Sequence, residues 1–144
     1  MILHGRKVMR GKASGEALVS SEAISFYGGV EPETGKVVEK GHPLEGQVVT
    51  GRILVFPTGK GSTVGSYTLY DMKKRGTAPA AIINREIETI VAVGAIISEI
   101  PCMDKIDTEK IRTGDKVVVD ADSGTVSVLR YSSHTGNPSD TVFR

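Results

Sequence analysis

A continuous apolar run, followed by a glycine-rich loop and a helical pattern, constrains the fold of this chain most. Apolar side chains follow one another in Arg52–Phe56, which is typical of a strand buried on both faces. Pro57–Gly61 predicts a tight loop, and a helical pattern begins at Ser62. Ala80–Ile83 then predicts a second buried strand. Because such a unit crosses over right-handed to a parallel neighbour, the chain is predicted to contain parallel strands.

The predicted helix has signals at both ends. Ser62 or Thr63 is a suitable N-cap, Lys73–Arg75 complements the negative end of the helix dipole, and Gly76 can adopt the left-handed conformation that stops a helix. One buried face is formed by Gly65, Thr68, Leu69 and Met72. The N-cap, the buried face and the C-terminal glycine therefore all predict the same helix.

The remaining segments predict further strands, a second helix and a closing hairpin. The expected strands are Arg6–Met9, Ala17–Val19, Gly35–Val38, Cys102–Met103, Lys116–Asp120 and Thr125–Leu129. Glu88–Ser98 fits either a buried strand or a buried helix, and its length favours the helix. The expected fold class is α/β, with a mixed, partly parallel buried sheet, two main helices and a C-terminal β-hairpin. We expect one folded domain over residues 1–130 and a mobile tail over residues 131–144.

Composition excludes several classes of function. The formal net charge is only +1, aromatic residues are 5% of the chain and Trp is absent, so we expect no nucleic-acid partner and no membrane surface. The sequence has no apolar run typical of a signal peptide, which predicts a cytoplasmic protein. Cys102 is the single cysteine and cannot by itself hold a metal cluster, so we expect no metal ligand in this chain. Any iron would be held by another chain.

The glycine-serine loop, Phe56–Thr63, is the candidate site. It lies where a buried strand ends and a helix begins, so backbone N–H groups are expected to point outward unpaired and bind an anion. Gly59 and Gly61 allow close approach of a ligand to the backbone, and Lys60 adds a positive charge. A nucleotide-binding P-loop is excluded, because it requires Ser or Thr directly after the lysine.

Ser62 has two interpretations. It is either only an N-cap, or a general base whose alkoxide is stabilised by unpaired N–H groups, the helix N-terminus and nearby cations. Such a base could take a proton from a carbon beside a group held by a metal Lewis acid that a partner supplies. Lys60 likewise is either a ligand-binding residue or a solvated surface lysine.

Three segments resemble a known family. They are Gly51–Pro57, Gly59–Tyr67 and Ser25–Val30, and the resemblance runs from about Val8 to Leu129. Together they resemble the small subunit of the aconitase X family, in particular the archaeal-type phosphomevalonate dehydratase branch. The long glycine-serine string makes this resemblance far more specific than a lone glycine motif.

The resemblance implies a swivelling β/β/α domain that packs on a large subunit carrying a [4Fe-4S] iron-sulfur cluster. It implies that Ser62 is the proton acceptor and that the chain is inactive alone. The substrate-binding residues implied or expected beside it are Gly59, Lys60, Gly61, Thr63, Gly28 and Gly29. The implied reaction dehydrates (R)-5-phosphomevalonate to trans-anhydromevalonate 5-phosphate in the mevalonate pathway of isoprenoid biosynthesis, whereas related members dehydrate cis-3-hydroxy-L-proline.

Two rival interpretations belong to other classes. A phosphohistidine carrier fits poorly, because His4, His42 and His134 all lie outside the glycine-serine loop. A non-catalytic anion-binding module stays open, as does the choice of hydroxy-acid substrate. The same donors would accept a phosphate or a carboxylate, so charge complementarity does not decide between them.

Overall fold

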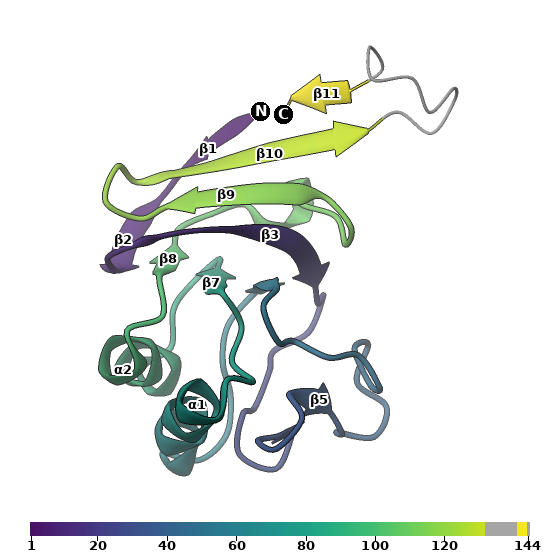
Figure 1. Cartoon of the computed structure of the whole chain (residues 1–144), viewed down its shortest axis with the longest axis vertical. Coiled ribbons are helices and arrows are strands. Elements are labelled where there is room, and N and C mark those ends of the chain that lie inside the picture. Colours follow the sequence, from purple (N-terminus) through teal and green to yellow (C-terminus); the bar gives the residue numbers. More distant parts are fainter. Residues whose placement is uncertain (132–140, 144) are drawn as a thin grey trace.

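The fold is built around one curved sheet whose parallel half carries the helices (Figure 1). The computed structural model describes residues 1–131 and 141–143. Four strands form the parallel half: β3 (Lys12–Val19), β6 (Ile53–Phe56), β7 (Ala81–Asn84) and β8 (Cys102–Asp104). Strands β6 and β7 flank the first helix and pair in parallel, so the predicted strand-helix-strand unit is confirmed.

The antiparallel half closes the sheet. Strand β9 (Lys116–Asp120) pairs with β3 and with β10 (Thr125–Tyr131), which is the predicted hairpin, and β10 pairs with β1 (Ile2–His4). Strand β2 (Arg6–Met9) pairs with β8, at the other end of the strand order. Only Gly5 separates β1 from β2, so the N-terminal segment joins the two ends of the sheet. A Cβ atom at Gly5 would lie 2.5 Å from the carbonyl oxygen of Asp104, and this crossing therefore requires glycine.

Two helices pack against each other beside the parallel half (Figure 1). Helix α1 (Val64–Arg75) ends at Gly76, whose φ of 80° is the predicted left-handed stop. Helix α2 (Thr89–Ser98) begins after Glu88, whose carboxylate accepts a hydrogen bond from the Val91 N–H at 3.2 Å. The helix interpretation of Glu88–Ser98 is therefore confirmed, with Glu88 as its cap.

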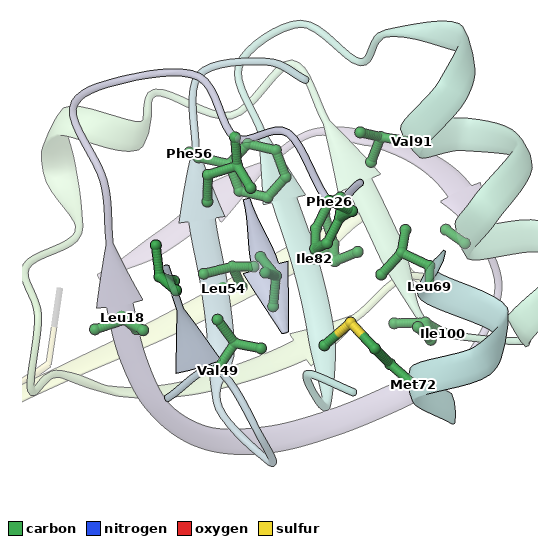
Figure 2. Close-up of a cluster of buried hydrophobic side chains, with 14 of the residues drawn as sticks. Leu18, Phe26, Val49, Leu54, Phe56, Leu69, Met72, Ile82, Val91 and Ile100 are labelled. Atoms are coloured by element: carbon green, nitrogen blue, oxygen red, sulfur yellow. The ribbon is translucent and has the colours of Figure 1, made fainter. Parts of the chain in front are cut away.

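The continuous apolar run of β6 is explained by two separate hydrophobic clusters. Ile53 and Val55 point into the closed sheet, and Leu54 and Phe56 point to the helices. Figure 2 shows the helix-side cluster, in which side chains of the sheet meet those of α1 and α2. All four β6 side chains are fully buried, so β6 has no polar face.

Several short elements complete the fold. The predicted strand Gly35–Val38 is observed as β5 (Lys36–Val37). Two further elements were not predicted from the sequence patterns: β4 (Val30–Glu31), which pairs with β5, and a 3₁₀ turn, η1, at Thr108–Lys110. The expected mobile tail falls mainly on residues 132–140 and 144, which lie outside the described residues. Within the same segment, the structure describes a short strand, β11 (Thr141–Phe143), which pairs with β10.

Within the described residues, no helix is long and apolar enough to cross a membrane. The expected α/β fold, with a mixed sheet, two main helices and a C-terminal hairpin, is confirmed.

Candidate active site

The glycine-serine loop lies at the carboxyl end of β6 and leads into α1. It is tied to the chain segment around Ile24, because the Lys60 N–H donates to the Ile24 carbonyl at 3.0 Å and the Ile24 N–H donates to the Thr58 carbonyl at 3.3 Å. This bridge holds the first half of the loop in place. The second half, from Gly61 onward, is exposed up to the start of α1.

Ser62 is exposed and lies directly before the helix. Its Oγ atom accepts a hydrogen bond from the Val64 N–H at 3.1 Å, so Ser62 supplies the capping interaction predicted for Ser62 or Thr63. Thr63 precedes the first helical residue, but its side chain caps no N–H group. The N-cap of α1 is thus Thr63, one of the two predicted caps, and the first helical residue is Val64.

Ser62 and its two neighbours along the chain have backbone N–H groups that are free within the described residues. Within residues 1–131 and 141–143, the N–H groups of Gly61, Ser62 and Thr63 make no hydrogen bond. They are followed by the positive end of the α1 dipole, and the first turn of α1 contains no acidic residue that would neutralise it. The arrangement can therefore bind an anion or stabilise an alkoxide on Ser62.

The charge of Lys60 is shared with a residue that sequence patterns did not reveal. Its Nζ atom lies 2.9 Å from Oε2 of Glu39, and the two side chains are 45% and 32% exposed. Glu39 precedes Lys60 by 21 positions and no motif connects them. The carboxylate of Glu39 therefore partly neutralises the positive charge that Lys60 adds to the loop.

Gly59 and Gly61 have structural reasons to be glycine besides approach to a ligand. Gly59 is buried, and a Cβ atom there would collide with Cγ2 of Val91 on α2. Gly61 has a φ of 103°, and its Cβ would collide with Oγ of Ser25. Ser25 is a site neighbour that the sequence patterns did not single out. Its hydroxyl donates to the Tyr27 carbonyl at 3.0 Å.

The segment Ser25–Val30 forms a second glycine loop, and its two glycines, Gly28 and Gly29, differ from each other. Gly29 makes a tight turn in which a Cβ atom would collide with the Ser25 carbonyl oxygen, so it has a steric reason to be glycine. Gly28 faces open space with a φ of 81° and lines a groove of about 510 Å³ together with Val64 and Tyr67. Ser62 does not line this groove, although it lies two residues before Val64.

An edge-to-face contact holds the second glycine loop beside the serine loop. The ring of Phe26 packs against Phe56, which ends β6, with 6.0 Å between the ring centroids (Figure 2). This buried pair places Tyr27 and Gly28 close to the start of α1, since the Tyr27 N lies 3.7 Å from a Cβ atom built on Gly65. The structure therefore brings both predicted glycine loops to the same region.

Cys102 is unsuited to chemistry. Burial, with a smaller effect from the Asp104 carboxylate, raises the pKa of the Cys102 thiol to about 12. Among the described residues, no three His, Cys, Asp or Glu side chains are grouped so that they could hold a metal ion. The donor set in this part of the chain does not fit an iron-sulfur cluster.

Comparison with known families gives one family match. The family described as Aconitase X swivel domain matches residues 2–128. Among curated proteins, the phosphomevalonate dehydratase small subunit of Thermococcus kodakarensis is 58% identical over 129 residues, covering 90% of this chain and 97% of that protein. The phosphomevalonate dehydratase small subunit of Methanocella arvoryzae is 53% identical, covering 89% of this chain and 99% of that protein.

Solved structures agree with the sequence comparisons. The crystal structure of aconitase X from Thermococcus kodakaraensis, in its holo-form, matches with a TM-score of 0.89 and 57% identity, over 90% of this chain and 99% of the matched chain. A solution NMR structure matches with a TM-score of 0.82 and 51% identity, over 90% of this chain and all (100%) of that chain. The similarity therefore covers the closed sheet and both helices.

Proposed function

This chain belongs to the aconitase X swivel domain family, and from that premise we propose that it is the small subunit of a phosphomevalonate dehydratase. The enzyme would be a hydro-lyase that converts (R)-5-phosphomevalonate to trans-anhydromevalonate 5-phosphate in the mevalonate pathway. The high identity to the phosphomevalonate dehydratase small subunits of Thermococcus kodakarensis and Methanocella arvoryzae supports this assignment. A cis-3-hydroxy-L-proline dehydratase is the alternative that the resemblance leaves open.

In this proposal, Ser62 is the proton acceptor, and one observation carries that role. Its exposed hydroxyl lies among three consecutive N–H groups without a partner in the described chain, at the N-terminus of a twelve-residue helix. A serine hydroxyl is a weak acid, so a fixed set of donors must stabilise its anion. Buried or fully hydrogen-bonded N–H groups would not supply that stabilisation.

The proposed reaction step is a proton transfer followed by loss of a hydroxyl group. The alkoxide of Ser62 takes a proton from the substrate carbon beside the carboxylate, and the electron pair of that C–H bond forms the new C=C bond. The substrate hydroxyl on the adjacent carbon leaves with the electron pair of its C–O bond and takes a proton from solvent to become water. Ser62 then releases the abstracted proton to solvent. In this proposal the free N–H groups of Gly61 and Thr63 stabilise the Ser62 alkoxide or an oxyanion of the bound substrate.

The reaction also needs a partner chain. We propose that a large subunit holds the [4Fe-4S] cluster, because the described residues of this chain offer no suitable ligand set and Cys102 is buried. When bound, the cluster would act as a Lewis acid on the leaving hydroxyl. The exposed position of Ser62 supports this division of labour, since a second polypeptide can cover it and exclude water.

An apolar surface beside Ser62 is suited to contact with such a partner. Tyr67 is 70% exposed and Tyr27 is 56% exposed, and both line the groove that includes Val64. Exposed aromatic side chains of this kind are enriched in protein interfaces. The groove therefore supports a docking role for the face that carries Ser62.

Co-expression with the large subunit tests the proposed function. The purified complex should dehydrate 5-phosphomevalonate under anaerobic conditions, whereas this chain alone should give no turnover. Turnover of cis-3-hydroxy-L-proline in place of 5-phosphomevalonate would assign the alternative substrate. Full turnover by the isolated chain would overturn the two-subunit assignment.

A further inference from the structure

A second cavity lies at the carboxyl ends of the parallel strands, apart from the groove beside Ser62. Its volume is about 790 Å³, within the range of small-molecule sites. Ser20 follows β3, Pro57 follows β6 and Arg85 follows β7, so three neighbouring strands each contribute a wall residue. Ligands of open parallel sheets generally bind outside this edge.

Two arginines line this cavity, and neither is strongly paired. The guanidinium of Arg112 makes no hydrogen bond or ion pair within the described part of the chain. Arg85 approaches Glu109 only to 3.9 Å, and their side chains are 52% and 83% exposed, so solvent screens that contact. The Arg85 guanidinium also makes a long hydrogen bond of 3.4 Å to the Thr108 hydroxyl.

The buried carboxylate of Asp115 interacts electrostatically with Arg112, but its side-chain hydrogen bonds come from another arginine. Asp115 accepts two short hydrogen bonds from the guanidinium of Arg130, at 2.8 and 2.6 Å, and a third from the backbone N–H of Arg112. Its charge is thus already matched by Arg130. The cavity therefore carries two positive charges against the single carboxylate of Glu109.

Hydroxyl groups complete the polar part of the lining. Ser21, Thr108 and Thr113 line the same cavity, and the Thr113 hydroxyl accepts a hydrogen bond from the Val19 N–H at 2.9 Å. Leu18, Leu44 and Ile111 form an apolar part. A ligand that suits this lining has a dianionic head and a short hydrocarbon body.

We propose that this cavity binds the phosphate group of a small phosphate monoester, with Arg85 and Arg112 as the binding residues. Guanidinium groups bind phosphate oxygens in pairs of parallel hydrogen bonds, and two guanidiniums match the two charges of a phosphate monoester better than the one charge of a carboxylate. The identification of the natural ligand as 5-phosphomevalonate rests on the proposed function. The binding of inorganic phosphate by the two arginines does not depend on that function.

Chemical-shift mapping of the full chain tests the site, with inorganic phosphate titrated at constant ionic strength. The amides of Ser20, Ser21 and Thr113 should shift together. The double variant Arg85→Gln/Arg112→Gln should weaken binding about tenfold or more, the effect expected from losing charge-assisted hydrogen bonds. Arg10→Gln is the matched control, because Arg10 is exposed and lies after β2, at the opposite edge of the parallel strands.

Three other results of these titrations would contradict the proposed phosphate site. Equal weakening by Arg10→Gln would show that binding follows net charge and would overturn the site. Chemical-shift changes confined to the amides of residues 59–65 would place the anion at the serine loop and would also overturn the proposed site. Mevalonate lacks the phosphate and should not shift these amides, whereas 5-phosphomevalonate should, and equal shifts by both would overturn the phosphate assignment.

The same titrations separate this inference from the proposed function. One result is that phosphate binds through the two arginines while the two-chain enzyme does not turn over 5-phosphomevalonate. That result would confirm the phosphate site and contradict the proposed function. If turnover is unchanged in Arg85→Gln/Arg112→Gln and phosphate does not bind, the proposed function stands and the cavity assignment fails.

Discussion

The ammonium nitrogen of Lys60 lies 2.9 Å from a carboxylate oxygen of Glu39, and this ion pair connects the serine loop to a distant part of the chain. Both side chains are partly exposed, so the pair adds at most about 1 kcal/mol to stability. Its larger consequence is electrostatic. Glu39 offsets a positive charge that would otherwise add fully to the anion-binding character of the loop.

Removing the charge of Glu39 should therefore favour anionic substrates. We expect Glu39→Gln to lower KM in the two-chain enzyme by about fivefold or less, the effect of about 1 kcal/mol. Lys60→Gln should raise KM, and the double variant should lie near the wild type. Steady-state kinetics at two salt concentrations would check this, because screening should reduce both effects. Unchanged KM in both single variants would remove Lys60 from the substrate site.

Replacing the proposed base should separate catalysis from stability. We expect Ser62→Ala to lower kcat by about 10²- to 10⁴-fold, the usual contribution of a general base. Loss of the hydrogen bond to the Val64 N–H should cost at most about 1 kcal/mol of stability. Single-turnover assays and thermal unfolding would measure the two effects.

A matched control for Ser62→Ala is Thr89→Ala, an exposed hydroxyl residue at the first position of the other helix. It should leave both kcat and the unfolding temperature almost unchanged. Near-normal kcat in Ser62→Ala would mean that another group accepts the proton and that Ser62 is only a cap.

The contact between Gly59 and Val91 should behave as a packing constraint. Gly59→Ala would press a Cβ atom against Cγ2 of Val91, whose branched side chain is stiff in a helix, and should destabilise the chain by about 1–3 kcal/mol. Adding Val91→Ala should recover part of that loss. Chemical denaturation of the two single variants and the double variant would give the coupling energy, and strictly additive effects would contradict the contact.

Two buried aspartates should make stability fall in acid. Burial opposes the ionisation of Asp104, but hydrogen bonds from Arg6 and the Ile87 N–H outweigh it and hold the Asp104 pKa below its usual range. Asp115 is similar, because Arg130 and the Arg112 N–H outweigh the effect of burial and lower its pKa. Each lowered pKa means that the folded state favours the ionised form.

The sign of the effect follows from linkage. The stabilisation is fully present above the unfolded pKa of about 3.9 and is lost as the pH falls through the lower folded values. We expect the free energy of unfolding to decrease with acid below about pH 4 and Asp104→Asn to flatten that decrease. Asp122→Asn, at an exposed turn position, is the control and should leave the pH profile unchanged. An equally steep profile in Asp104→Asn would contradict the role of this pair.

Local signals were sufficient to predict much of the fold. The apolar run of β6, the cap and stop signals of α1 and the alternation of the closing hairpin all depend on neighbouring residues along the chain. The same holds for the position of Ser62 between a buried strand and a helix. The start of α1 was predicted in the same way, since Thr63 is one of the two predicted N-caps and Ser62 accepts a hydrogen bond from the Val64 N–H.

By itself, the sequence determined the strand-helix-strand unit and the position of Ser62 in the glycine-rich loop that joins the strand to the helix. Tertiary structure alone decided that Glu39 pairs with Lys60, that Gly59 packs on Val91 and that two arginines share one cavity. The patterns that predict helices and strands involve residues only a few positions apart. These tertiary contacts join distant positions, which meet only when the sheet closes and the helices pack against it.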